Sequence, residues 1–195
     1  MALTAAALAL AGCGGGERQD ADDSDGTYRV DVVTAEFPAQ QHLADETTLE
    51  LVVRNESGRT IPNLSATLEA VGSDGTRAAA FSRTDETPGL SSRSRPVWIV
   101  DESPGSTAYG DTYATGPVAP DREGRFLWRV AAIVPGRYRL TYRLSGSLGG
   151  GAKVVEGDGE RASGSFDVDV DRRPAQARVT ADGNVERVPA SEARR

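Results

Sequence analysis

The residues that usually carry covalent chemistry are scarce in this sequence. It contains a single histidine, His42, and a single cysteine, Cys13, among 195 residues. A Ser-His-Asp or Cys-His centre would have to use His42, which lies in a polar stretch, and no G-x-S-x-G elbow supplies a nucleophile. Transition-metal sites need clusters of His, Cys or Met, and the chain has one of each. We therefore expect a protein that is not an enzyme and that holds no metal or other cofactor.

The context of Cys13 indicates a different use for its sulfur. A short apolar block, LTAAALALA, fills residues 3–11 and is typical of a secretory signal. The tetrad LAGC at residues 10–13 resembles the bacterial lipobox, although no basic residues precede the block. A start site placed too far downstream would explain that absence. The resemblance implies that residues 1–12 are a signal peptide, that Cys13 becomes the first residue, and that a diacylglyceryl group on its sulfur tethers the chain to the extracytoplasmic face of the cell membrane. The alternative is a free buried thiol, for which the flanking glycines leave no core.

The charge distribution separates residues 13–26 from the rest. Five acidic residues and one arginine before residue 27 account for −4 of the net charge of −7. Rich in Gly, Asp and Ser, this stretch predicts a flexible acidic linker. An acidic chain lacks the positive field that nucleic-acid binding requires, so we expect no nucleic-acid partner. A single cysteine cannot form an internal disulfide, so stability must come from a core.

From Tyr28 onward, apolar and polar residues alternate with a period of two. Such alternation predicts short antiparallel strands that bury one face. The residues expected to face inward are Tyr28, Val30 and Val32, then after a change of phase Val33, Ala35 and Phe37, followed by Leu49, Leu51, Val53, Leu64, Ala66, Leu68, Ala70, Val97 to Val100, Phe126, Trp128, Val130, Tyr138, Leu140, Tyr142, Leu144, Phe166, Val168 and Val170. The change of phase predicts a bulge or a strand that changes sheets. Val134-Pro135-Gly136 is expected to turn residues 126–130 and 138–144 into one hairpin.

About seven to nine such strands favour an all-β sandwich of two antiparallel sheets, with a barrel as the alternative. The segments LELVVRNESGRTIPNLSATL and FLWRVAAIVPGRYRLTYRL resemble the immunoglobulin-like, CARDB and adhesion-module repeats of bacterial cell-surface proteins. The resemblance implies an immunoglobulin-like sandwich over residues 27–171. Residues 172–195 are expected to form a short hairpin around Asp182-Gly183 and a disordered tail.

Four arginines, Arg129, Arg137, Arg139 and Arg143, are expected on the outer face of the predicted hairpin. They could form a basic stripe that binds an anionic envelope polymer or lipid headgroups. The favoured interpretation is that they pair across the sheet with Asp167 and Asp169, if the strands at 137–143 and 166–170 are neighbours.

The segment 101–124 is the longest stretch without clear alternation, and long loops often carry binding sites. Its acidic residues, Asp101, Glu102, Asp111, Asp121 and Glu123, could offer oxygen ligands to a cation, while Tyr109 and Tyr113 contact a ligand. The plainer interpretation is solvated turns or an irregular edge strand. Acidic pairs could also serve glycoside hydrolysis, although a small sandwich offers little cleft for a sugar.

These observations predict a membrane-tethered lipoprotein whose sandwich binds an envelope protein or polymer without catalysis. The alternative is a module that binds calcium, carbohydrate or another small ligand through residues 101–124. A purely structural spacer with no specific ligand is the third interpretation.

Overall fold

The computed structural model of the chain describes residues 26–83, 96–105, 107–109, 111–148, 151–174 and 176–187. Cys13, the predicted signal peptide, the predicted linker up to residue 25 and residues 188–195 with the predicted tail lie outside these ranges, whereas Gly26 already belongs to a strand. The described residues form strands and no helices, which confirms the all-β class predicted from the period-two alternation. Within those ranges, nothing helical has the length and apolarity that crossing a membrane demands.

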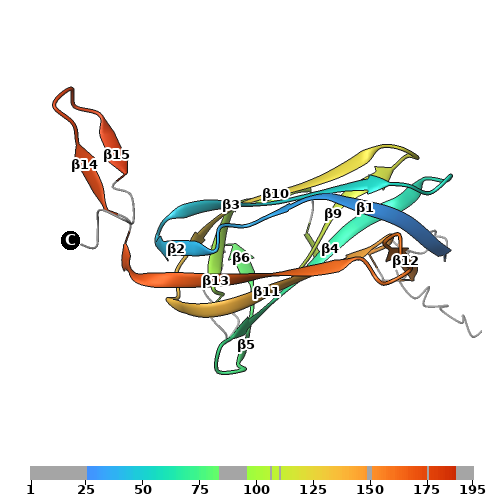
Figure 1. Cartoon of the computed structure of the whole chain (residues 1–195), viewed down its shortest axis with the longest axis horizontal. Coiled ribbons are helices and arrows are strands. Elements are labelled where there is room, and N and C mark those ends of the chain that lie inside the picture. Colours follow the sequence, from blue (N-terminus) through green and yellow to red (C-terminus); the bar gives the residue numbers. More distant parts are fainter. Residues whose placement is uncertain are drawn as a thin grey trace, which may run out of the picture.

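Two sheets pack face to face (Figure 1). The first sheet contains, in spatial order, β6 (Phe81–Arg83), β7 (Trp98–Glu102), β10 (Glu123–Ala132), β3 (Glu46–Asn55) and β1 (Gly26–Glu36). The second sheet contains, in spatial order, β12 (Ala152–Val155), β11 (Gly136–Ser145), β4 (Ile61–Gly72), β9 (Thr112–Val118) and β8 (Thr107–Tyr109). Three further strands pair with members of this sheet: β13 (Ser163–Pro174) with β11, β2 (Gln40–Leu43) with β13, and β5 (Arg77–Ala78) with β4. Eight of these strands have five or more residues, in keeping with the predicted seven to nine.

Strand β1 belongs to both sheets. Gly26 to Arg29 pair in parallel with β12 of the second sheet, and from Val30 onward the strand pairs antiparallel with β3 of the first. A register shift between Val32 and Thr34 lies where the sequence changes phase, so a bulge and a change of sheet both occur in this strand. Val33 and Ala35, both expected to face inward after the change of phase, are instead exposed, Val33 at 44%. Among the described residues, the hydrogen-bonded path ends at β6 and β8, which do not pair with each other, so these strands form an open sandwich and not a closed barrel.

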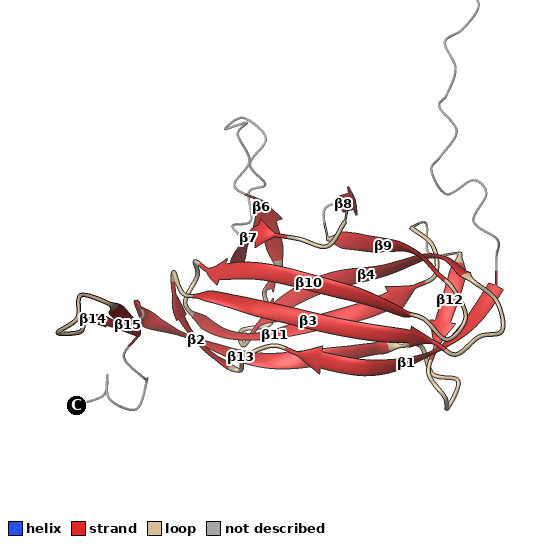
Figure 2. Ribbon diagram, turned by 90° about the horizontal axis from the view of Figure 1, so that it is seen from above, coloured by secondary structure: helices blue, strands red, loops and turns tan. Residues whose placement is uncertain are grey.

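The core lies between the sheets and follows the predicted alternation. Along β3 and β10, the burial pattern alternates residue by residue, and Leu49, Leu51, Phe126 and Trp128 are fully buried. Trp98 of β7 lies at one end of this core and contacts the rings of Phe37, Phe81 and Tyr138 edge-on. The sandwich is long and narrow when seen from above (Figure 2), with its strands running along the long axis.

The predicted hairpin of residues 126–130 and 138–144 is wrong. β10 pairs with β3 and β7 in the first sheet, whereas β11 pairs with β4 and β13 in the second. The residues around Pro135 therefore carry the chain from one sheet to the other. The misassignment has a physical cause, because strands on opposite sheets face the same core and show the same inward alternation as the two arms of a hairpin.

The C-terminal hairpin forms as predicted, from β14 (Ala177–Val179) and β15 (Val185–Arg187), with Gly183 of the turn at φ +81°. It pairs with neither main sheet and extends beyond the end of β13 (Figure 1). Its paired valines, Val179 and Val185, are both more than 70% exposed.

A buried hydrogen bond ties the two sheets together and yields a stability prediction. The indole N–H of Trp98, in the first sheet, donates to the side-chain oxygen of Gln41, in the second, at 2.7 Å, and Gln41 Nε2 donates to the Pro38 carbonyl at 2.9 Å. Gln41→Leu leaves the buried indole N–H without a partner. We expect it to lower the free energy of unfolding by about 1 to 3 kcal/mol, measured by urea denaturation. Gln40→Leu, at the exposed neighbouring position, should change it by less than about 0.5 kcal/mol; equal losses in the two variants would contradict this role for Gln41.

Candidate binding surfaces

The four arginines expected on one stripe are divided between the two sheets. Arg129 lies on β10 of the first sheet, while Arg137, Arg139 and Arg143 lie on β11 of the second. The arginines are divided because the chain crosses from the first sheet to the second at residues 133–135. The two groups face away from each other across the core, so they form two separate surfaces.

The three arginines of β11 pair with acids on neighbouring strands. Arg137 and Arg139 lie in register with Asp169 and Asp167 of β13. Arg139 Nε donates to Asp167 Oδ1 at 2.8 Å and its Nη2 donates to Oδ2 at 3.1 Å, whereas Arg137 lies 3.5 Å from Asp169. The hydrogen bond from Arg139 lowers the pKa of the Asp167 carboxyl. Arg143 turns to the other neighbour and donates to Glu69 of β4 at 2.9 Å.

The expected pairing with Asp167 and Asp169 forms for Arg137 and Arg139, because β11 and β13 are adjacent. Arg143 and Arg129 pair with acids on other strands instead. All of these pairs are exposed to solvent, so water and salt screen them and they contribute little to stability. Each guanidinium of β11 nevertheless lies next to a carboxylate on a neighbouring strand, so positive and negative charges alternate at defined places on this face.

The predicted loop at 101–124 is largely strand. It comprises the end of β7, then β8, β9 and the start of β10. Tyr113 faces the core at 3% exposure and packs edge-on against Trp128, so it cannot contact a ligand at the surface. Tyr109 belongs to β8, and its side chain lies outside the described residues. The irregular edge strand is thus the interpretation that the structure supports.

The acidic residues of this segment do not converge on a cation site. Asp101 and Glu102 both form ion pairs with Arg129, and Glu123 pairs with Arg54 across β3 and β10. In the part of the chain that the structure describes, no three His, Cys, Asp or Glu side chains gather as metal ligands would. The calcium alternative for residues 101–124 therefore has no geometric support here.

A shallow groove of about 610 Å³ lies on the outer face of the second sheet. Its floor is the paired region of β11 and β13, and β2 and the turn after β4 form its two sides. The lining residues include Arg137, Arg139, Asp167, Asp169, Gln40 and Val71. The sequence identified the arginines and aspartates but not the groove, because β2 is too short to show an alternation pattern.

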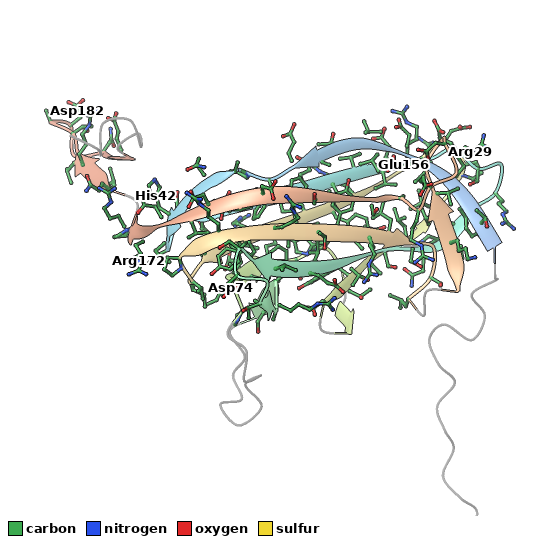
Figure 3. The ribbon with its side chains drawn as sticks, turned by 60° about the horizontal axis from the view of Figure 1, so that its bottom comes forward. Arg29, His42, Asp74, Glu156, Arg172 and Asp182 are labelled. Atoms are coloured by element: carbon green, nitrogen blue, oxygen red, sulfur yellow. The ribbon has the colours of Figure 1, made fainter. Side chains whose placement is uncertain are left out.

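His42 lies at the same end of the molecule (Figure 3). It belongs to β2, in register with Asp171 of β13, and not to the polar loop expected from the sequence. Its Nδ1 is buried and has no hydrogen-bond partner among the described residues.

No protein-family model and no curated protein matches this chain. Among solved structures it is similar to the CARDB domain of a Pyrococcus furiosus protein in complex with di-metal ions, with 14% identity and a TM-score of 0.41 over 74% of this chain and 86% of that one. A chain from the human seminal-plasma complex of zinc 2-glycoprotein and prolactin inducible protein is similar at 14% identity and a TM-score of 0.40, covering 73% and 93%. A family 123 glycoside hydrolase from Clostridium perfringens is similar at 11% identity and a TM-score of 0.37, covering 76% and 23%. At such identities, the site residues of those proteins do not transfer to this chain.

Asp111, beside β9, gives a pH-dependent prediction. Burial, with the negative charge of Glu69 as a smaller cause, raises the pKa of its carboxyl above the ordinary 3.8. The folded state therefore keeps the proton to higher pH than the unfolded state, and ionisation of Asp111 destabilises the fold as pH rises through this window.

We expect Asp111→Asn to raise the melting temperature at pH 7 and to leave it unchanged at about pH 3.5, where both states are mostly protonated. Circular-dichroism melts at the two pH values measure this. Asp31→Asn, on the exposed side of β1, is the control and should show no gain at pH 7. A lower melting temperature for Asp111→Asn at pH 7 would contradict the prediction.

Proposed function

We propose that this chain is an exported lipoprotein, anchored through Cys13, whose β-sandwich binds an envelope protein or polymer without catalysis. The sequence support for the anchor is the LAGC tetrad after an apolar block. The structural support for binding is the groove on the second sheet.

One observation carries the proposal: the groove and the entry of the N-terminal segment lie at opposite ends of the sandwich. β1 begins at Gly26 beside Ala152 of β12, and Arg29 and Glu156 mark this end in Figure 3. The groove lies toward the other end, which His42 and Arg172 mark. β11 connects the two ends and, at about 3.3 Å per residue, its ten residues span about 30 Å. A tether at Cys13 would therefore attach to the end of the sandwich farther from the groove, which leaves the groove accessible to a partner.

The chemistry of the groove suits a partner that carries both charges. Arg137 and Arg139 alternate with Asp169 and Asp167, and Val71 and Ala39 add apolar edges. Fixed charges of both signs favour a partner with complementary pairs, as in a protein surface or a zwitterionic polymer. Residues 101–124 offer much less, since Tyr113 is buried and three of the five acids, Asp101, Glu102 and Glu123, pair with arginines.

The anchor is tested by replacing its sulfur. We expect the wild-type chain to incorporate radiolabelled palmitate and to partition into the detergent phase, and Cys13→Ser to do neither, because no thiol remains to carry the lipid. The double variant Cys13→Ser/Ser24→Cys keeps one cysteine outside the tetrad and should also stay unlabelled. Labelling of the double variant, or unchanged partitioning of Cys13→Ser, would overturn the proposed anchor.

The groove is tested by charge reversal on each sheet. Arg139→Glu places two acids side by side in the groove, and we expect it to reduce capture of chemically cross-linked envelope partners by about tenfold. Arg129→Glu is the matched control, because Arg129 also forms exposed ion pairs but lies on the first sheet. Circular dichroism should show both variants folded. Equal capture by Arg139→Glu and Arg129→Glu would show that the groove is not the binding surface.

A further inference from the structure

A second, smaller cavity lies on the second sheet, at the end where β1 begins. It measures about 140 Å³ and is lined by three cations from three segments: Arg143 of β11, Lys153 of β12 and Arg161 of the turn between β12 and β13. The hydroxyl-bearing residues Thr67 and Ser145 complete the polar part of its wall.

Within the described part of the chain, two of the three cations of this cavity form no ion pair, although the turn that carries Arg161 also holds Glu156, Asp158 and Glu160. Arg143 has Glu69 at 2.9 Å. Among the described residues, no carboxylate lies within ion-pair distance of Lys153 or Arg161. Along β11 itself, Arg137 and Arg139 each have an acid partner at the other end of the strand.

Backbone pairing places the three residues that carry these cations around the cavity. Lys153 lies in register with Ser145 of β11, and a bridge between Val155 and Arg161 folds the turn after β12 back on itself. The Ala162 N–H donates to the Val154 carbonyl at 3.0 Å, and the Leu144 N–H donates to the Ala162 carbonyl at 2.9 Å. The ligand would therefore meet a site whose backbone is already in place.

The size and chemistry of the cavity define the class of ligand. A volume of 140 Å³ corresponds to about four or five water molecules at about 30 Å³ each, which admits a tetrahedral oxyanion but not a large organic group. Guanidinium groups bind such oxygens in pairs, and a lysine adds a point charge. We propose that Arg143, Lys153 and Arg161 form a binding site for a phosphate-class oxyanion.

The site adjoins the N-terminal end of the sandwich. Lys153 lies in register with Thr27, which is the second residue of β1. A lipid headgroup and a free phosphate share the chemistry that this site recognises, and its place beside Thr27 makes the headgroup the more accessible source for a tethered chain. The proposal does not depend on the groove or on Cys13, since it rests on the charges around this cavity alone.

The first test uses the full chain and inorganic phosphate. Titration calorimetry at constant ionic strength, with sodium chloride replaced by sodium phosphate, should show saturable binding to the wild type. Lys153→Gln/Arg161→Gln should weaken it at least about tenfold. Arg77→Gln/Arg172→Gln is the matched control: it removes two exposed arginines far from the cavity, on β5 and at the end of β13, and should bind phosphate like the wild type. No saturable phosphate binding, or equal binding by the two double variants, would overturn the proposal.

The second test identifies the source of the oxyanion and uses the same variants on a Cys13→Ser background. Flotation is measured with vesicles of phosphatidylglycerol and phosphatidylcholine and with vesicles of phosphatidylcholine alone. Binding to the anionic vesicles that the Lys153/Arg161 variant loses and the control keeps supports a headgroup. Phosphate binding in calorimetry without such a difference in flotation supports the site with a soluble oxyanion as its ligand. The results of calorimetry and of flotation keep their meaning even if the groove proves not to bind a partner or Cys13 proves not to carry a lipid.

Discussion

Trp98 and Trp128 project from the first sheet into the space between the sheets, and the rest of the fold depends on how that space is filled. Phe126 stacks on Trp128, Tyr113 meets it edge-on from the second sheet, and Trp98 contacts Tyr138 on the same opposite side. Burying these rings requires both sheets at once, because neither sheet alone covers them. The same requirement turns every second residue outward, which is how the arginines and aspartates of β11 and β13 come to share one exposed face.

The sequence predicted what depends on neighbours along the chain. Alternation at Leu49, Leu51 and Val53, and again at Phe126, Trp128 and Val130, identified strands and core correctly, because the side-chain period of a strand is local. Strand pairing is not local, so the hairpin of β10 with β11 was wrong and the pairing of β11 with β4 was missed. The pairing of β11 with β13 was expected only from the opposite charges on the two strands. Short edge strands such as β2 were missed for a related reason, since four residues give almost no periodic signal. The groove depends on β2 and on strand pairing, so the sequence identified only its arginines and aspartates. Of the three cations around the small cavity, it identified Arg143 but not Lys153 or Arg161.

The outer face of the second sheet combines two kinds of charge arrangement. Toward the groove, Arg139 and Asp167 neutralise each other, and the hydrogen bond between them lowers the pKa of Asp167, so the surface is polar but balanced. Toward the start of β1, Lys153 and Arg161 have no carboxylate within ion-pair distance among the described residues. A balanced face suits recognition of another macromolecule, and an unbalanced cavity suits a small anion. The two proposals therefore assign different ligands to the two ends of one sheet.

The central claim is that this chain meets its partner through the groove on the second sheet, at the end away from the tether. The most direct measurement is photo-cross-linking in intact cells, with the photoreactive residue placed at Val71 in the groove or at Val33 on the exposed side of β1. The account predicts a discrete cross-linked species in the membrane fraction from position 71 and none from position 33. A cross-linked species from position 33 alone, or equal products from the two positions, would contradict it.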